Sequence, residues 1–335
     1  MIEALFIGNF LSKSRGSLSV SETIAYNLKN TNEAKVLTAS HLQNRMIRFA
    51  DILISVLFKR YDVLHIDVFS GNSFLFAQIA AAIGKMRGKK IVLTLHGGAL
   101  HEHYRGREQS FKKLFEGTYV QSPSTFLKSF FEKEGYEVAY CPNPLEVEKF
   151  PFKRNDVAPY SLLWVRAFTP IYNPHVPVEV LKMVLKDYPL ATLTMVGPDK
   201  GLLKDTLALI ERLKLTERVK VVGSVKNDEL STHYQSHAVY LNTTSYESFG
   251  VAVAEAACCG IPVVSFSVGE IPFLWKDEEN ILLTSPLDVE RMASQVSRIF
   301  KDEALGNRLS IQARKRAEQF SWENIKPHWL KILSR

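Results

Sequence analysis

The sequence predicts an α/β protein built from two doubly wound domains in series, and three observations carry this prediction. The chain has 335 residues, which is too long for one ordinary α/β domain and suits two of middling size. Short apolar runs alternate with amphipathic segments, which is the pattern of βαβ units. The alternation stops at two proline-containing stretches, Cys141–Pro144 and Phe150–Asn155, and then restarts, so we interpret them as a linker.

The first predicted domain covers residues 1–155 and contains a series of apolar runs of strand length. Helical segments such as Val20–Lys29 and Phe74–Lys85 separate these runs, so the strands should form a parallel sheet covered by helices. The predicted strands are Glu3–Gly8, Ala34–Thr38, Asp62–Asp67, Lys90–His96, Thr118–Gln121 and Glu137–Cys141.

The second predicted domain covers residues 156–320 and repeats the pattern. The stretch from Asp288 to Arg335 is wholly helical, and we expect its last helix, at about 321–335, to pack back on the first domain. The predicted strands are Ser161–Arg166, Ala191–Gly197, Arg218–Gly223, Ala238–Thr243, Pro262–Phe266 and Asn280–Leu283.

Composition narrows the class of protein. A hydrophobic fraction of 46% is that of a soluble globular protein, and there is no apolar run of about 18 residues that would span a membrane. The N-terminus has no basic stretch before an apolar core, so we do not expect a signal peptide. The three cysteines, Cys141, Cys258 and Cys259, form no C-x-x-C pair, which argues against disulfides and zinc and favours the cytoplasm.

The basic excess is confined to the first half. Residues 1–155 hold 21 of the 42 Lys and Arg but only 14 of the 35 Asp and Glu. Residues 156–335 therefore hold 21 basic and 21 acidic residues and have no net charge. Arg45, Arg48, Lys59 and Arg60 flank an apolar segment, Ile52–Phe58, on one predicted helix. Such a helix can lie on an anionic membrane surface or favour an anionic, lipid-linked acceptor, while a solvated basic face is an equal alternative. Nucleic acid is disfavoured because no aromatic side chains alternate with these charges. A second basic cluster is formed by Lys85, Arg87, Lys89 and Lys90.

Polar and small residues collect where the predicted strands end. In open α/β sheets ligands bind beyond the carboxyl ends of the strands, so we expect the site in a cleft between the two domains. The Gly-Gly pair after His96 favours a functional histidine, whereas His101 and His103 lack a third metal ligand. The residues at strand ends are Gly8-Asn9, His65–Asp67, His96–Gly98, Arg166, Gly197-Pro198, Gly223-Ser224 and Asn242–Ser245.

One segment combines an anion site with two carboxylates. Ser248 is predicted to cap a helix that runs to about Cys259 and ends at Gly260. The amides of Phe249, Gly250 and Val251 would then be free at the helix start, which suits a diphosphate. Glu255 is the only charge on this otherwise apolar helix. It either contacts a ligand or is a core acid paired with an arginine or a backbone amide, and spacing alone leaves both open.

The spacing of Glu247 and Glu255, E-x7-E, stands within Tyr246–Val264, and this segment resembles the family 4 retaining glycosyltransferases of the GT-B type. The resemblance covers most of the chain and is strongest from Trp164 to Leu283. Other matching segments are Lys59–His65, Leu95–Gly97, Pro142–Pro144, Ser267–Pro272, Asn280–Leu283 and Phe320–Trp322.

The resemblance implies two Rossmann-like domains facing each other across a cleft, and transfer of a sugar from a UDP- or GDP-linked donor without a metal. The acceptor would be a carbohydrate or lipid-linked hydroxyl in the assembly of cell-surface polysaccharide, lipopolysaccharide or glycolipid. It also implies roles for single residues. Glu255 would hold the ribose, Glu247 the donor sugar, and His96 would lie at the reaction centre. Arg166 and the amides near Ser248, Phe249, Gly250 and Val251 would bind the diphosphate, Gly16 and Gly197 would allow close approach, and Gly223 and Val225 would border the base.

The chain departs from the family pattern at one phosphate-binding position. Tyr172–Pro174 stands where the family usually has Lys-Gly. The sequence also lacks the G-x-G-x-x-G typical of NAD sites, a P-loop and the D-x-D that would hold a divalent ion. Two other functions remain as alternatives, namely a sugar-nucleotide epimerase of the same fold and a two-lobed sugar-binding protein without catalysis.

Overall fold

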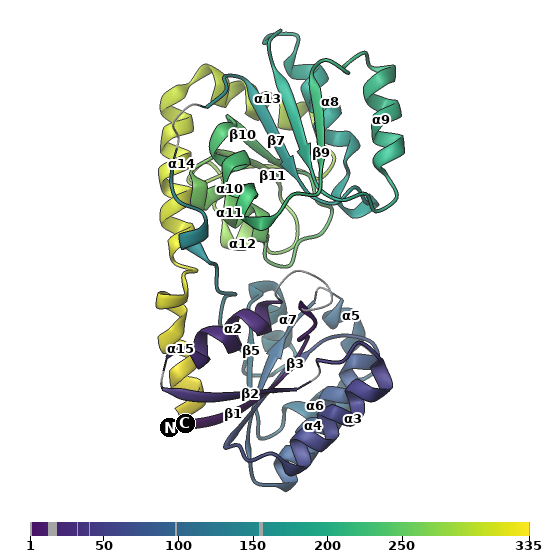
Figure 1. The fold of residues 1–335 in the computed structure, drawn as a ribbon, viewed down its shortest axis with the longest axis vertical. Helices are drawn as coiled ribbons and strands as arrows, with labels where there is room; N and C mark the ends of the chain where they lie inside the picture. Colours follow the sequence, from purple (N-terminus) through teal and green to yellow (C-terminus); the bar gives the residue numbers. More distant parts are fainter. Residues whose placement is uncertain are drawn as a thin grey trace. The chain divides into compact units, whose positions relative to one another are not determined.

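The computed structural model describes residues 2–12, 19–31, 33–39, 41–97, 99–153 and 157–334. The predicted site residue Gly16 and the last residue of the strand-end segment His96–Gly98 therefore lie outside the described residues. Two compact units make up the chain (Figure 1). One unit is Met1–Pro144 together with Trp322–Arg335, and the other is Leu145–Ser321.

The first unit is built on a parallel six-stranded sheet in the order β2-β1-β3-β4-β5-β6. All the strands predicted for this half are present, with ends shifted by up to two residues. They are β1 Ile2–Ile7, β2 Ala34–Ala39, β3 Val63–Val68, β4 Lys90–Leu95, β5 Tyr119–Ser122 and β6 Ala139–Tyr140. The helices are α2 Val20–Lys29, α3 Arg45–Phe58, α4 Asn72–Met86, α5 Leu100–Tyr104, α6 Glu108–Phe115, α7 Thr125–Lys133 and α15 Trp322–Ser334.

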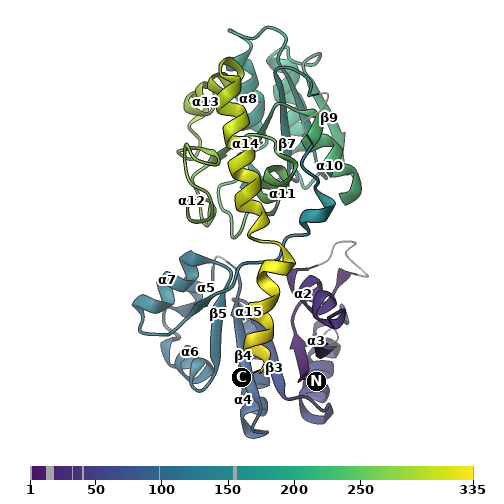
Figure 2. The ribbon, with the colours of Figure 1, turned by 90° about the vertical axis from the view of Figure 1, so that its left-hand side faces the viewer.

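Alternate residues of β1 face the two sides of this sheet, as the period of a strand requires. Leu5 and Ile7 belong to the core formed with α3 and α4, whereas Ala4 and Phe6 belong to the core formed with α2 and α15. In Figure 2 the yellow α15 lies across the strands of this unit, next to α2. Its Trp329 is buried, with its ring centroid 5.9 Å from that of Phe6. The last helix therefore completes the core of the unit in which the chain begins.

The second unit contains a second parallel six-stranded sheet, in the order β12-β11-β10-β7-β8-β9. Its strands are β7 Ser161–Val165, β8 Thr192–Val196, β9 Val219–Gly223, β10 Val239–Asn242, β11 Val263–Phe266 and β12 Leu282–Thr284. Its α-helices are α8 His175–Val184, α9 Leu203–Arg212, α10 Asn227–Ser236, α11 Val251–Cys259, α12 Ile271–Leu274, α13 Val289–Lys301 and α14 Glu303–Glu318. Short 3-10 turns form at Val147–Lys149 and Pro170–Tyr172.

The chain leaves the first unit earlier than the predicted boundary at residue 155, because the segment after Pro144 packs on the second unit. The Phe150 ring lies 6.2 Å from that of Tyr234, and its carbonyl accepts a hydrogen bond of 2.9 Å from Arg314 Nη1. The predicted linker is therefore partly folded onto its neighbour. Of the helices in the described part of the chain, none has the length and apolar character needed to cross a membrane.

Candidate functional site

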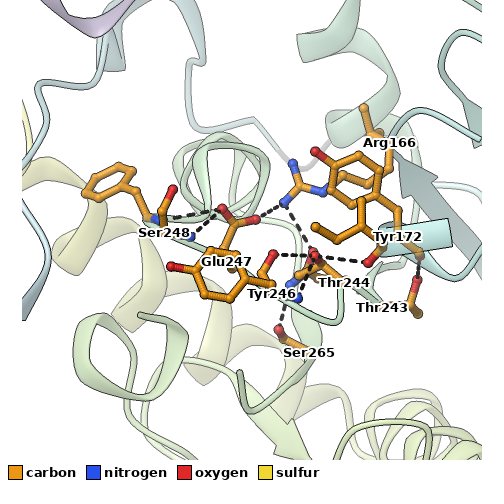
Figure 3. A network of polar contacts seen from close by, with 12 residues as sticks. Arg166, Tyr172, Thr243, Thr244, Tyr246, Glu247, Ser248 and Ser265 are labelled. Carbon is orange, nitrogen blue, oxygen red and sulfur yellow. Dashed lines mark hydrogen bonds and ion pairs between the residues drawn. The ribbon is translucent and has the colours of Figure 1, made fainter. Parts of the chain in front are cut away.

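Arg166 is the centre of a polar network at the carboxyl ends of the strands of the second unit (Figure 3). It follows the last residue of β7, and its Nη2 donates to Glu247 Oε2 at 2.7 Å and to Asn242 Oδ1 at 3.2 Å. Asn242 ends the neighbouring strand β10. Parallel strands bring these residues to the same edge of the sheet, so a cation and a carboxylate 81 residues apart form an ion pair.

The ion pair is largely removed from solvent. The side chains of Arg166 and Glu247 are 12% and 14% exposed. Among the described residues, the Nε of Arg166 is buried without a hydrogen-bond partner, although a guanidinium has five N–H donors to satisfy. The Tyr172 ring lies 5.2 Å from the Arg166 Cζ. The guanidinium is thus held in place by Glu247, Asn242 and the ring of Tyr172.

The backbone around Glu247 is held by the loop between β11 and α12. The amide of Glu270 donates to the Glu247 carbonyl at 2.9 Å. Gly269 has a φ of +52°, and a Cβ placed there would lie 2.0 Å from the Glu247 oxygen. The side chain of Glu247 in turn accepts hydrogen bonds from the amides of Ser248 at 3.1 Å and Phe249 at 3.5 Å. The segment Ser267–Pro272 therefore serves to position Glu247.

The start of α11 corrects the prediction that Ser248 is its N-cap. The helix begins at Val251, and its N-cap is Gly250, in the left-handed conformation with φ +84° and no side-chain hydrogen bond. The turn at Gly250 separates Ser248 from the helix, and the Phe249 amide is bonded to Glu247 instead of being free. The amides of the first helical turn, from Val251 onward, keep the orientation that favours an anion.

Glu255 is paired with a tyrosine, which neither interpretation of the sequence included. Its Oε2 accepts a hydrogen bond of 3.1 Å from the Tyr234 hydroxyl on α10. Burial raises the pKa of Glu255 to about 7, against the Tyr234 hydrogen bond and the charge of Arg166, which lower it. A carboxyl group with this pKa changes its charge near neutral pH. Strongly perturbed carboxyl groups are typical of functional sites, which favours the ligand-binding interpretation of Glu255.

The segment that replaces the expected Lys-Gly fastens the loop after β10. Asn173, in the left-handed conformation with φ +47°, donates from its amide to the Thr243 carbonyl at 2.8 Å and to Ser245 Oγ at 2.7 Å. The Thr243 hydroxyl donates to the Tyr172 carbonyl at 2.7 Å (Figure 3). This departure from the family pattern thus contributes tertiary structure, and the aromatic ring of Tyr172 stands beside Arg166 in place of a second cation.

The remaining predicted residues of this unit differ in their surroundings. A Cβ at Gly197, whose φ is +150°, would lie 1.9 Å from the Arg166 oxygen, so close packing on Arg166 itself requires a glycine there. A Cβ at Gly223, whose φ is +83°, would meet nothing within 4 Å. Val225 is half-buried in the loop between β9 and α10. The backbone of Gly223 therefore has open space beside it at the end of β9, which is compatible with the predicted base.

His96 belongs to the first unit, where it follows β4 and bonds to an aspartate. Its Nε2 lies 3.1 Å from Asp67 Oδ1, and its ring stacks on Phe69 with centroids 5.2 Å apart. A pocket of about 320 Å³ opens beside Asp67 and Phe69, with walls from the loop after β1 and from α3 and α4. Its lining is mainly apolar, and its polar residues are Asn9, Arg48, Asp67 and Ser73, together with the backbone of Gly8.

Sequence reasoning identified Arg166, Glu247, Glu255 and His96 singly but did not identify their partners. Asp67 and Asn242 lie at the carboxyl ends of predicted strands, and this position was their only signal. Nothing in the sequence marks Tyr234, because α10 and α11 meet only in the folded chain. In the described part of the chain no group of three or more His, Cys, Asp and Glu could hold a metal ion.

Comparison with known proteins agrees with this architecture. The model of the family described as glycosyl transferases group 1 matches residues 147–316. The chain is 23% identical over 276 residues to the glycogen synthase of Mycobacterium tuberculosis, which covers 77% of this chain and 66% of the relative. It is 28% identical over 116 residues to the O-antigen chain mannosyltransferase B of Escherichia coli, covering 35% and 30% of the two chains.

Solved structures show the same fold over the whole chain. Sucrose-phosphate synthase from Thermosynechococcus elongatus superposes with a TM-score of 0.76 at 18% identity, covering 100% of this chain and 98% of that one. The Anabaena protein HepE, in complex with UDP and glucose, superposes with a TM-score of 0.75 at 17% identity over 100% of both chains. These likenesses confirm the predicted fold of two Rossmann-like domains of the GT-B type. Since the family model spans half of the sequence, the chain belongs to the glycosyl transferases group 1 family.

Proposed function

We propose that this protein is a retaining glycosyltransferase that moves a sugar from a nucleoside-diphosphate sugar to a hydroxyl group of an acceptor. The observation that carries the proposal is the buried pair of Arg166 and Glu247 beside the start of α11. An arginine at the strand ends and the amides of a helix start are suited to a diphosphate. The UDP complexes of HepE give a precedent for such a donor on this fold.

The second domain holds the donor in this proposal. Arg166 and the first amides of α11 bind the diphosphate, and Glu255 accepts hydrogen bonds from the ribose hydroxyls. Glu247 contacts the donor sugar, and Ser248, Phe249 and Gly250 shape the turn that brings it there. Gly197 keeps Arg166 in place, while Gly223 and Val225 border the base. UDP and GDP donors remain alternatives, since no contact in the site distinguishes the bases.

The first domain, which contains His96, presents the acceptor. In the transfer step, the bond between the anomeric carbon and the diphosphate oxygen breaks, and a bond to the acceptor oxygen forms. The acceptor proton passes to the departing phosphate, so attack occurs on the face that the diphosphate leaves and the configuration is retained. Arg166 and the α11 amides stabilise the charge that develops on the diphosphate. Double displacement through a carboxylate is the alternative chemistry.

Product analysis tests the proposal against its closest rival, a sugar-nucleotide epimerase. With UDP-, GDP- and ADP-sugars and a mixture of carbohydrate acceptors, the proposal predicts a new glycoside of retained configuration and one nucleoside diphosphate per glycoside. An epimerase would convert the donor without any acceptor and would release no glycoside. A sugar-binding protein would leave both substrates unchanged.

Transfer is expected to continue in the presence of EDTA. The proposed diphosphate site relies on Arg166 and backbone amides, which need no divalent ion to neutralise the phosphate charge. Initial rates of transfer in an excess of EDTA should match those measured with added Mn²⁺. Loss of activity in the chelator that manganese restores would contradict this expectation.

We further propose a cytoplasmic protein that meets an anionic membrane surface through α3 of its first domain. Met46, Ile47, Ile54, Leu57 and Phe58 are exposed, and helical spacing places them on one side of α3. Arg60, directly after the helix, is 96% exposed, and Arg87 binds the carbonyls of Val56 and Lys59 at the same end. The side chain of Arg45, a predicted member of this face, is outside the described residues. Acceptors linked to lipid would be reached at such a surface.

Vesicle co-sedimentation checks the membrane proposal. The protein should pellet with phosphatidylserine vesicles but not with phosphatidylcholine vesicles, and salt should release it. Ile54→Ser/Phe58→Ser and Lys59→Glu/Arg60→Glu should each weaken binding, the latter because each basic residue near the surface adds about 1 kcal/mol. The control Lys186→Glu/Lys204→Glu changes the net charge equally in the second domain and should pellet normally. Equal behaviour of all four proteins would exclude this surface.

A further inference from the structure

A buried carboxylate that the proposed reaction does not use lies next to His96. The side chain of Asp67, the last residue but one of β3, is 1% exposed. Its Oδ1 is 3.1 Å from His96 Nε2, and its Oδ2 accepts a hydrogen bond from the Ser21 hydroxyl in the first turn of α2. A Cβ at Gly8, after β1, would lie 2.1 Å from Oδ2. Three different elements therefore leave room for this carboxylate and give it one orientation.

Asp67 carries its negative charge in this environment. Burial raises the pKa of Asp67, but its interaction with His96 and the hydrogen bond from Ser21 outweigh burial and bring this pKa below the ordinary value. His65 is neutral at pH 7, because burial lowers its pKa to about 4 despite the charge of Asp67. The start of α2 adds the positive end of a helix dipole. Burial of a charge costs desolvation free energy even when hydrogen bonds and a helix dipole compensate for it. A buried carboxylate with these partners therefore indicates a functional role.

The geometry fixes which nitrogen of His96 carries a proton. An ionised carboxylate only accepts hydrogen bonds, so the contact of 3.1 Å requires a proton on His96 Nε2. In the neutral ring, Nδ1 is then a hydrogen-bond acceptor. The stacked ring of Phe69 restricts the remaining rotation of the imidazole. Such pairs of a carboxylate and a histidine set both the orientation and the tautomer of the ring.

We propose that Asp67 is a positioning residue, which holds His96 with Nε2 protonated and Nδ1 ready to accept a hydrogen bond from a substrate hydroxyl. The catalytic consequence rests on the proposed function, which places His96 at the reaction centre. With the ring held in this way, His96 orients a hydroxyl of the sugar or acceptor without removing its proton. This is compatible with a reaction in which the departing diphosphate takes that proton.

A line of hydrogen-bonded polar side chains lies next to Asp67 in the same unit. His65 Nε2 lies 2.7 Å from Thr94 Oγ1, which accepts from Gln121 Nε2 at 3.0 Å. The Gln121 Oε1 is in turn 3.1 Å from His328 Nε2 on α15. The network joins β3, β4, β5 and the last helix on one side of the sheet. His65 Nε2 lies 3.9 Å from Asp67 Oδ1, so this line of side chains forms a fixed neighbour of the Asp67 carboxylate.

The test is a nuclear magnetic resonance measurement of the histidine rings, which needs no substrate. In protein labelled with ¹⁵N only in its nine histidines, His96 should give a protected Nε2–H signal at low field. A ring proton bonded to a carboxylate exchanges slowly, whereas a free one exchanges too fast to be seen. His96→Gln identifies the signal. Its absence from the wild type would overturn the proposal at once.

Variants separate positioning from folding. Asp67→Ala should remove the His96 signal, and Asp67→Asn should move it to higher field, because a neutral acceptor is weaker. Ser21→Ala removes the hydrogen bond to the other oxygen of the Asp67 carboxylate, and it should leave the His96 signal unchanged. In every variant, an unchanged signal from the buried His65 ring should show that the sheet is intact. A His96 signal unchanged in both Asp67 variants would contradict the proposed hydrogen bond.

Kinetics measure the consequence for transfer, with UDP-glucose as the first donor probe and the other nucleotide sugars after it. In Asp67→Asn, kcat should fall roughly 100-fold while KM for the donor changes little, since loss of alignment affects the chemical step. Unchanged kcat would contradict the positioning role. If wild-type protein transfers no sugar from any donor, the proposed function fails, while the ring signal still decides the hydrogen bond.

Discussion

Replacement of Arg166 by methionine is expected to abolish detectable binding of a nucleoside diphosphate and to destabilise the fold. The variant removes charge-assisted hydrogen bonds to the phosphates, each worth roughly 1.5–3 kcal/mol, so affinity should fall at least about 100-fold. It also leaves Glu247, only 14% exposed, without its cation. Breaking one side of a buried ion pair costs about 3–5 kcal/mol of unfolding free energy. Denaturant unfolding and calorimetric titration with UDP and GDP measure the two effects.

A double variant separates the structural role of Arg166 from its role in binding. Arg166→Met/Glu247→Gln removes both charges, so most of the lost stability should return, whereas nucleotide binding should not. Arg298→Met is the matched control, because it breaks an ion pair with Glu278 whose side chains are 41% and 45% exposed. That loss should be only about 0.2–1 kcal/mol and should leave binding unchanged. Normal binding by the double variant would mean that Arg166 only holds Glu247 in place.

Replacement of Glu255 by glutamine is expected to weaken nucleotide binding while making the free protein more stable above neutral pH. The pKa of about 7 in the folded state exceeds the ordinary value of 4.5, because burial disfavours the charged form. The folded chain therefore binds the Glu255 proton more tightly than the unfolded chain does. This difference stabilises the folded wild type fully below pH 4.5, and the stabilisation is lost as the pH rises to about 7. Glutamine never becomes charged, so its stability does not fall over this range. As the pH is raised from 5 to 8, the unfolding free energy of the variant should rise on the order of 2–3 kcal/mol relative to that of the wild type.

Binding should change in the opposite direction. A ribose hydroxyl that donates to Glu255 requires the carboxylate, so the wild-type affinity should fall as pH drops from 8 to 6. Glu255→Gln should lower the affinity at pH 8 by roughly 10- to 100-fold, the loss of a charge-assisted hydrogen bond, and should lose this part of the pH dependence. Tyr234→Phe keeps the Glu255 carboxylate but removes the hydrogen bond that lowers its pKa. In this variant the midpoint of the pH dependence of nucleotide affinity should therefore lie at a higher pH than in the wild type. A strongly destabilised Glu255→Gln with normal binding would make Glu255 a core acid.

Local patterns in the sequence were sufficient for the elements of the fold. Each predicted strand has a counterpart, since a buried parallel strand must be a short apolar run between helical segments. The predicted helix Val20–Lys29 is confirmed with the same ends, which its capping box with Ser19 and Glu22 explains. The start of α11 was predicted wrongly, because a serine is a common N-cap and the left-handed turn at Gly250 leaves no other mark in the sequence.

The site could be predicted only as separate residues. Strand ends pointed to Arg166 and His96, but the pairs with Glu247 and Asp67 join residues that are 81 and 29 positions apart. These contacts depend on the strand order, in which β7 lies beside β10 and β3 beside β4. The role of Gly269 depends on a backbone approach to Glu247 that no spacing reveals. Partners of functional groups are set by tertiary structure, so they follow only once the sheet is known.

Calorimetric titration of the full chain with UDP, GDP and ADP decides whether the strand ends around Arg166 form a nucleotide-sugar donor site. We predict one binding site for at least one of these nucleotides in the wild type and none for it in Arg166→Met/Glu247→Gln. We also predict unchanged binding in His96→Gln, because His96 belongs to the other domain. Absence of binding by the wild type to all three nucleotides, or equal binding by the wild type and the double variant, would contradict it.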